Sequence, residues 1–161
     1  MPEPKPAVRQ AMAAEAAAIS ELALRSKAHW GYSAEFIEAC REELTVTPAQ
    51  LDDPQRYYGL AELDGQLLGY YGIVGLGGGE FELDALFVEP EHIGRGVGRL
   101  LMAEACLQAL SFGGLTMIIQ GDPHAEAFYL AAGAVSIGSR PSESIPGRLL
   151  PLFRLTLESV S

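Results

Sequence analysis

The chain has 161 residues, of which 48% are hydrophobic and 20% are charged, and this length and composition predict one globular domain spanning residues 1–161. The formal net charge of −10 argues against nucleic acid as the main partner, because phosphate binding depends on Lys and Arg. No apolar run reaches the roughly 18 residues of a membrane helix, and residues 1–22 lack the apolar core of a secretion signal, so we expect a cytoplasmic protein with no membrane partner.

The first third of the chain is predicted to be mostly helical. Residues 1–6 contain three prolines, which exclude a helix or a central strand, and they are expected to form a flexible tail before a short strand near Val8. Residues 13–27 are strong helix formers with apolar side chains on one face. A second helix is predicted over residues 33–43, with a serine as its N-cap. Residues 48–54 carry turn signals and are expected to form loops.

Three strands are predicted next, over residues 57–63, 67–76 and 80–88. An Asp-Gly pair separates the first two strands and a triple glycine separates the last two, and such turns join antiparallel neighbours. No helix follows the triple glycine, so we assign it no phosphate-binding role. These segments therefore predict an antiparallel meander.

A glycine-rich loop, Ile93-Gly94-Arg95-Gly96-Val97-Gly98, lies between the third of these strands and an amphipathic helical pattern. This order places backbone N–H groups at a helix N-terminus, where the helix dipole stabilises anions. The spacing excludes a dinucleotide fingerprint, which would need glycine at Arg99 or Leu101, and a Walker A loop, which would need Gly-Lys-Ser/Thr. Diphosphate binding is one interpretation, and a tight turn without a ligand is the other.

The C-terminal elements complete a mixed sheet. Residues 115–120 form an apolar, β-branched run that predicts a buried strand parallel to the strand ending at Val88. Residues 122–132 begin with Asp-Pro and are followed by glycine, which is typical of a capped helix. Two last strands are predicted over residues 135–137 and 149–157. The fold class is therefore α/β (α+β), with a mostly antiparallel sheet of about seven strands and about four helices on both faces.

Two blocks in this order resemble the GNAT family of N-acyltransferases. The first spans residues 86–101, and the second spans residues 122–134, beginning Asp-Pro-His-Ala-Glu-Ala-Phe-Tyr. The family pattern for the second block is Asn-x-x-Ala-x-x-Phe-Tyr-x-x-x-Gly-Phe, from which Asp122 and Ala134 depart. Ile93 stands where the family usually has Gln or Arg, so that side-chain contact is absent, and only the backbone N–H of Ile93 is expected to remain available.

The resemblance implies a sheet splayed between strands four and five, with acetyl-CoA bound in the splay and no metal. The backbone of residues 86–88 would pair with the pantetheine arm and polarise the thioester carbonyl, and the glycine loop would hold the pyrophosphate. The residues implied to contact the cofactor are Leu86, Phe87, Val88, Ile93, Gly94, Arg95, Gly96, Val97, Gly98, Arg99, Asp122 and Phe128.

Two residues are implied to be catalytic. Tyr129 holds the family's general-acid position, and a phenol with a pKa of about 10 is still protonated when a thiolate leaves; the alternative is a core aromatic. Glu82 resembles the general base of the histone-acetylating branch, and Asp84 would bind the amine. In the alternative, Glu82 and Asp84 only attract the cationic amine, and an ordered water deprotonates it. Strand alternation predicts Phe81, Leu83, Ala85 and Phe87 on one face and Glu82, Asp84, Leu86 and Val88 on the other.

The expected acceptor is the primary amine of a small molecule or of a protein N-terminus. Trp30 and Tyr32 lie between the first two helices, where the family builds its acceptor pocket, and they can stack on the substrate or cover the sheet. Arg148, in a predicted loop over residues 139–150, can pair with an acceptor carboxylate or form a surface salt bridge. The leading hypothesis is a ternary-complex N-acetyltransferase, and the resemblance allows a homodimer; the alternative is a catalytically silent acyl-CoA-binding or regulatory module.

Overall fold

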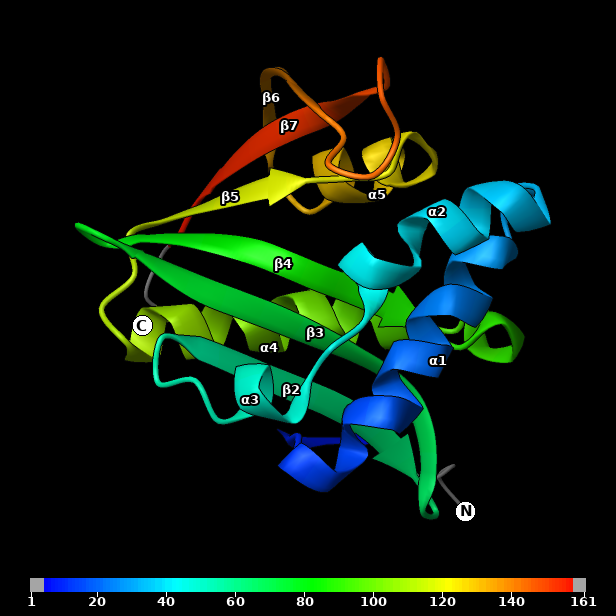
Figure 1. Ribbon diagram of the computed structural model, residues 1–161. Coiled ribbons are helices and arrows are strands. Elements are labelled where there is room, and N and C mark those ends of the chain that lie inside the picture. Colours follow the sequence, from blue (N-terminus) through cyan, green and yellow to red (C-terminus); the bar gives the residue numbers. More distant parts are fainter. Residues whose placement is uncertain (1–4, 158–161) are drawn as a thin grey trace.

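The computed structural model describes residues 5–157, which contain one seven-stranded sheet with helices on both faces (Figure 1). The strand order is β1-β2-β3-β4-β5-β7-β6, and every neighbouring pair is antiparallel except β4 with β5. This confirms the predicted mixed, mostly antiparallel sheet. Residues 1–4 of the expected tail lie outside the described residues. The strands are β1 (Ala7–Gln10), β2 (Arg56–Leu63), β3 (Gln66–Gly77), β4 (Glu80–Val88), β5 (Thr116–Gln120), β6 (Val135–Pro141) and β7 (Leu149–Thr156).

Helices cover the two faces of this sheet and form two hydrophobic clusters with it. Helix α4 packs against β2, β3 and β4 on one face, and α1 packs on the other face with α2 beside it (Figure 1). The α-helices are α1 (Ala16–Ala28), α2 (Ala34–Leu44), α3 (Pro48–Leu51), α4 (Val97–Ser111) and α5 (Glu126–Ala131). Short 3₁₀ turns η1 (Ala13–Glu15), η2 (Pro90–His92) and η3 (Pro123–Ala125) precede or connect them.

The segment after α2 differs from its prediction, because residues 48–51 form the short helix α3 instead of a loop. Thr47 caps this helix: its hydroxyl accepts from the N–H of Gln50 at 3.2 Å, and its own N–H donates to the Gln50 side chain at 2.9 Å. Pro48 occupies the first turn, where the missing N–H costs nothing. Strand β6 also continues to Pro141, beyond the predicted end at residue 137.

The predicted side-chain alternation of β4 is wrong beyond Leu83. The β3–β4 register shifts by one residue, so that Gly72 pairs with Ala85 and Ile73 with Leu83, and Asp84 is the extra residue of a β-bulge. The hydrophobic cluster that the sheet forms with α4 (the α4 cluster) therefore includes Leu83 and is contacted by Phe81, Leu86 and Val88. The cluster that the sheet forms with α1 (the α1 cluster) is contacted by Ala85 and Phe87. A bulge of this kind turns the strand and re-aims its side chains toward a site.

The bulge lies where β4 separates from β5. Parallel pairing joins Glu80–Leu83 to Thr116–Ile119 and then ends, while β4 stays paired with β3 as far as Val88. Figure 1 shows the two strands starting side by side and diverging toward α2 and α5. The predicted splay is thus present, and it leaves residues 84–88 of β4 with one backbone edge that has no strand partner.

Candidate functional site

A cavity of about 1410 Å³ occupies the splay. Its lining runs from the glycine loop along the free edge of β4 to α2, and it includes the end of β5, α5 and the segment between β6 and β7. Most predicted site residues line it: Trp30, Glu82, Asp84, Leu86, Phe87, Val88, Ile93, Gly94, Gly96, Gly98, Arg99, Asp122, Phe128 and Tyr129. Three predicted site residues do not line the cavity: Arg95, Val97 and Tyr32.

Three of the four residues of the glycine loop that line this cavity are glycines, so the loop presents mainly backbone to it. Gly94 and Gly96 have φ angles of 85° and 87°, and a Cβ added to either would meet nothing within 4 Å. Gly96 is the N-cap of α4, so the N–H groups of the first helical turn have no partner within the helix. The loop is therefore an open surface of N–H donors at the positive end of a 15-residue helix, which suits a phosphate-bearing ligand.

Three positions of this loop make contacts within the fold that limit which of their groups can face a ligand. The N–H of Ile93 is not available, because it donates to the Pro90 carbonyl at 3.3 Å as η2 ends. Arg95 is also held through its backbone, donating to the His92 carbonyl at 3.3 Å. Val97 has a buried side chain in the α4 cluster, so only its N–H can face a ligand.

Tyr129 lies on α5 with its ring packed between the end of β5 and the core. A Cβ on Gly121 would come within 2.8 Å of this ring, so the close approach requires glycine. On its other side the ring meets Phe153, with centroids 5.7 Å apart. Burial raises the pKa of the Tyr129 phenol, and the negative charge of Asp122 raises it further. The hydroxyl therefore stays protonated in the physiological range and has a proton to donate.

The two predicted acids of β4 each meet an arginine. Glu82 accepts from Arg140 of β6 at 2.6 Å, and Asp84 accepts from Arg56 of β2 at 2.9 Å. Loss of bulk water within the cavity raises the pKa of Asp84, although Arg56 acts in the opposite direction. The Asp84 carboxylate is therefore more basic than a free aspartate.

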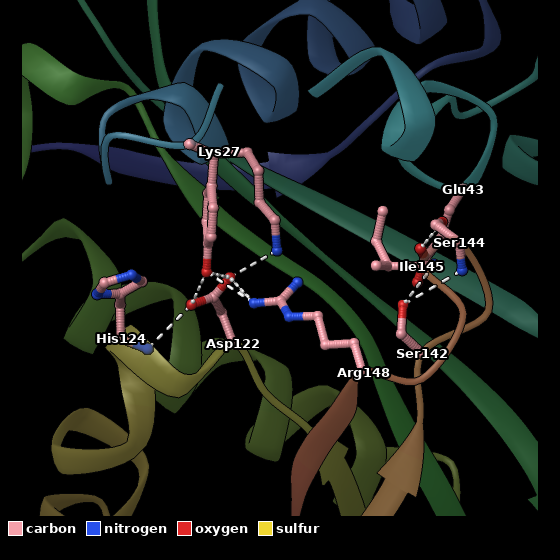
Figure 2. Close-up of polar contacts among 9 residues, drawn as sticks. Lys27, Glu43, Asp122, His124, Ser142, Ser144, Ile145 and Arg148 are labelled. Atoms are coloured by element: carbon pink, nitrogen blue, oxygen red, sulfur yellow. Dashed lines mark hydrogen bonds and ion pairs between the residues drawn. The ribbon is translucent and has the colours of Figure 1, made fainter. Parts of the chain in front are cut away.

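Asp122 is the centre of a polar cluster at the cavity wall (Figure 2). Its carboxylate accepts from Lys27 of α1 at 2.6 Å, from the Tyr32 hydroxyl at 2.9 Å and from the backbone N–H of His124 at 2.9 Å. The guanidinium of Arg148 lies 3.7 Å away. Burial alone would raise the pKa of Asp122, but Lys27, the His124 N–H and Tyr32 together hold it below its usual value.

Aromatic rings surround this cluster. The Trp30 and His124 rings are stacked, with centroids 5.1 Å apart and planes within 3° of parallel. The Tyr32 ring stacks on Phe36 at 4.2 Å, and Arg148 lies over both of these rings. Tyr32 therefore acts on the cavity through Asp122 and Arg148, whereas Trp30 lines it directly.

Several polar residues of the cavity were not predicted. Lys27, Arg56 and Arg140 come from α1, β2 and β6, and each reaches a carboxylate at least 28 residues away in the chain. No local spacing links such pairs, so only the folded sheet brings them together. Figure 2 also shows that the β6–β7 segment reaches α2, where the Ser144 hydroxyl donates to Glu43.

Residues 5–157 contain neither a metal-ligand cluster nor a membrane-spanning helix. No group of three or more His, Cys, Asp or Glu side chains there is arranged to hold a metal ion. No helix in that range has both the length and the apolar character needed to cross a membrane.

Several solved structures resemble this fold over nearly their whole length. An N-acetyltransferase called PaiA from Thermoplasma acidophilum, in complex with coenzyme A, is 18% identical and has a TM-score of 0.79; the alignment covers 94% of this chain and 99% of that one. An aminoglycoside 6′-N-acetyltransferase complexed with coenzyme A is 18% identical, with a TM-score of 0.73 and coverage of 96% and 99%. The ribosomal-protein-S18-alanine N-acetyltransferase of Escherichia coli is 14% identical, with a TM-score of 0.72 and coverage of 98% and 97%. At these identities the likeness establishes the fold.

Sequence comparison identifies the family. A search of curated protein sequences finds no match. The sequence profile of the acetyltransferase (GNAT) family, however, matches residues 18–134, which is well over half of the chain and includes both blocks that resemble that family. This chain therefore belongs to the acetyltransferase (GNAT) family.

Proposed function

We propose that the chain transfers an acetyl group from acetyl-CoA to the primary amine of a small molecule, within a ternary complex. The observation that carries the proposal is the free edge of β4 past Leu83, which leads through η2 to the open N-terminus of α4. A strand edge can pair with an extended amide chain, and a helix N-terminus can hold a diphosphate. Acetyl-CoA carries a pantetheine arm and a pyrophosphate in this order.

The proposed binding contacts follow from which backbone groups are free. Residues 86–88 would pair with the pantetheine arm, and an N–H near the bulge would donate to the thioester carbonyl. The N–H groups of residues 96–99 would hold the pyrophosphate, with the Arg99 side chain beside them. Phe128 closes this end of the cavity, since a Cβ on Gly98 would lie 3.4 Å from its ring.

The proposed chemistry uses two groups of opposite character. The amine loses a proton to Asp84, directly or through water, and its nitrogen attacks the thioester carbon. An amide bond forms as the carbon–sulfur bond breaks, Tyr129 gives its proton to the departing thiolate, and the second proton that the nitrogen must lose passes through water to the Tyr129 phenolate. The raised pKa of Asp84 favours proton uptake, and the raised pKa of Tyr129 keeps its proton in place until the thiolate forms. Both acids have an arginine partner, but the Glu82–Arg140 contact at 2.6 Å is shorter than the Asp84–Arg56 contact at 2.9 Å, so Glu82 would contribute mainly negative charge.

The similar structures support the same class of reaction. Two of the three described above are complexes with coenzyme A, and the names of two of them specify as acceptor an aminoglycoside or a ribosomal-protein alanine. For this chain we favour a small acceptor, because α2 and the β6–β7 segment meet through Glu43 and Ser144 beside the cavity.

The test is thiol release from acetyl-CoA across a panel of primary amines, with Tyr129→Phe and Tyr57→Phe compared. Tyr57 is a matched control, since it is partly buried but does not line the cavity. Loss of a general acid lowers turnover by about 10²- to 10⁴-fold, so we expect that loss for Tyr129→Phe only, with little change in acetyl-CoA affinity. Equal turnover of the two variants would refute the role of Tyr129.

A second candidate is an acyl-CoA-binding module without catalysis. Two residues favour it. The N–H of Ile93 donates to Pro90 and its side chain lacks the polar group usual in the family. The Asp122 carboxylate is paired with Lys27. Tight acetyl-CoA binding with no thiol release for any amine would support this candidate over the enzyme.

A further inference from the structure

Arg148 has hydrogen-bonding capacity that the protein does not use. Its guanidinium carbon lies 4.8 Å from the centre of the Phe36 ring and 5.2 Å from that of Tyr32, and its Nη2 donates to the Tyr32 hydroxyl at 2.7 Å. The side chain is only 18% exposed and lines the cavity. Nε and Nη1 make no hydrogen bond within residues 5–157, and Figure 2 shows another guanidinium nitrogen directed away from Asp122. Arginine has five N–H donors in a planar fork that matches a carboxylate.

The charge around Arg148 is also unbalanced. Lys27 and Arg148 both lie against the single carboxylate of Asp122, so this part of the wall carries two positive charges and one negative charge. The three side chains are between 12% and 18% exposed, and the cavity screens their charges less than open water would. This wall therefore attracts an anion.

Another part of the same cavity has the opposite balance. Glu82, Asp84 and Glu43 all line it, and the charges of Glu82 and Glu43 both act on Asp84. Arg56 pairs with Asp84 and Arg140 pairs with Glu82, whereas Glu43 has no ion pair with a basic side chain within residues 5–157, so this part has an excess of negative charge. A cavity with an acidic part and a basic part is complementary to a molecule that carries both an ammonium and a carboxylate.

We propose that the acceptor is an amino acid or another small amine that carries a carboxylate, and that Arg148 binds this carboxylate. The inference rests on the proposed acetyl transfer and specifies its substrate class. The ammonium enters beside Asp84, where it loses a proton, while Nε and Nη1 of Arg148 take the carboxylate oxygens. A neutral or purely cationic amine leaves those donors without a partner and is the poorer substrate.

The test compares each of the twenty L-amino acids with its primary amide, which retains the amine and lacks the negative charge. The measured quantity is the ratio of kcat/KM for the acid to kcat/KM for the amide. Thiol release from acetyl-CoA is the assay for both. We expect at least one acid to exceed its amide by about 10- to 100-fold, the effect of one hydrogen-bonded charge. Arg148→Gln should reduce this ratio toward one, and Arg148→Lys should restore part of it.

Arg41→Gln is the control, because Arg41 is an exposed residue of α2 paired only with Glu38. A structural role for Arg148 would lower turnover of acid and amide alike and leave the ratio unchanged, which would overturn the proposal. Amides that react as fast as every acid would overturn it too, while acetyl transfer itself would stand. If no amine releases thiol, the proposed function fails. The role of Arg148 is then decided by melting temperatures measured with coenzyme A present: at least one acid should raise the melting temperature more than its amide does. If no acid does so, the role of Arg148 is overturned.

Discussion

Replacing Asp122 with Asn removes one charge from the polar cluster while leaving its shape almost unchanged. Asn caps helices about as well as Asp, so the amide oxygen can still accept from the His124 N–H at the start of η3. What disappears is the attraction to Lys27, whose Nζ lies 2.6 Å away, and to Arg148 at 3.7 Å. The substitution therefore isolates the electrostatic contribution of Asp122.

The magnitude follows from the low exposure of the pair. The Lys27 and Asp122 side chains are 12% and 14% exposed, between a surface pair and a fully buried one. Surface pairs contribute about 0–1 kcal/mol, and removing one partner of a buried pair costs about 3–5 kcal/mol. We expect Asp122→Asn to lower the free energy of unfolding by about 2 kcal/mol, or the melting temperature by roughly 4–8 °C for a chain of this length.

Urea unfolding across a pH series is the assay. The pKa of Asp122 is depressed in the folded chain, so its contribution is complete above the unfolded value of about 3.9 and is lost as pH falls through the lower folded pKa. The difference between wild type and Asp122→Asn should therefore shrink in acid. Adding Lys27→Met should cost less than the sum of the two single changes. A pH-independent difference, or additive effects, would refute the reasoning.

Two further predictions concern the cavity and the loop. Asp84→Asn should lower kcat/KM about 100-fold, measured by thiol release, and by more than Glu82→Gln does, because Arg140 holds Glu82 at 2.6 Å and Arg56 holds Asp84 at 2.9 Å; equal losses would remove Asp84 from the proposed role. Gly96→Ala forces a side chain into a φ of 87° and should lower the free energy of unfolding by about 1–2 kcal/mol and weaken acetyl-CoA binding measured by calorimetry. Unchanged stability would show that the loop relaxes.

Local signals in the sequence predict most of the fold. The Asp-Gly turn and the triple glycine mark the meander, and Ser33 and Asp122 do cap their helices through the N–H groups of Phe36 and His124. The glycine loop is recognisable because its positive φ values require glycine within a short stretch. Pro48 is a loop signal in the sequence, but proline also suits the first turn of a helix, and residues 48–51 form α3.

The parts that could not be predicted depend on pairing across the chain. The bulge at Asp84 exists only relative to the register of β3, and strict alternation could not anticipate it. Lys27 and Asp122 are 95 residues apart, and Glu82 and Arg140 are 58 apart. Their contacts follow from sheet order and not from spacing, so the charge balance of the cavity emerges only in three dimensions.

The central claim is that acetyl-CoA binds in the splay between β4 and β5. Hydrogen–deuterium exchange with and without acetyl-CoA tests it most directly, because it reports on backbone N–H groups along the whole chain. We predict slower exchange in peptides covering residues 84–88 and 93–100 on binding, with β1 and α3 unchanged. Saturating acetyl-CoA that leaves exchange in both peptides unaltered would contradict the claim.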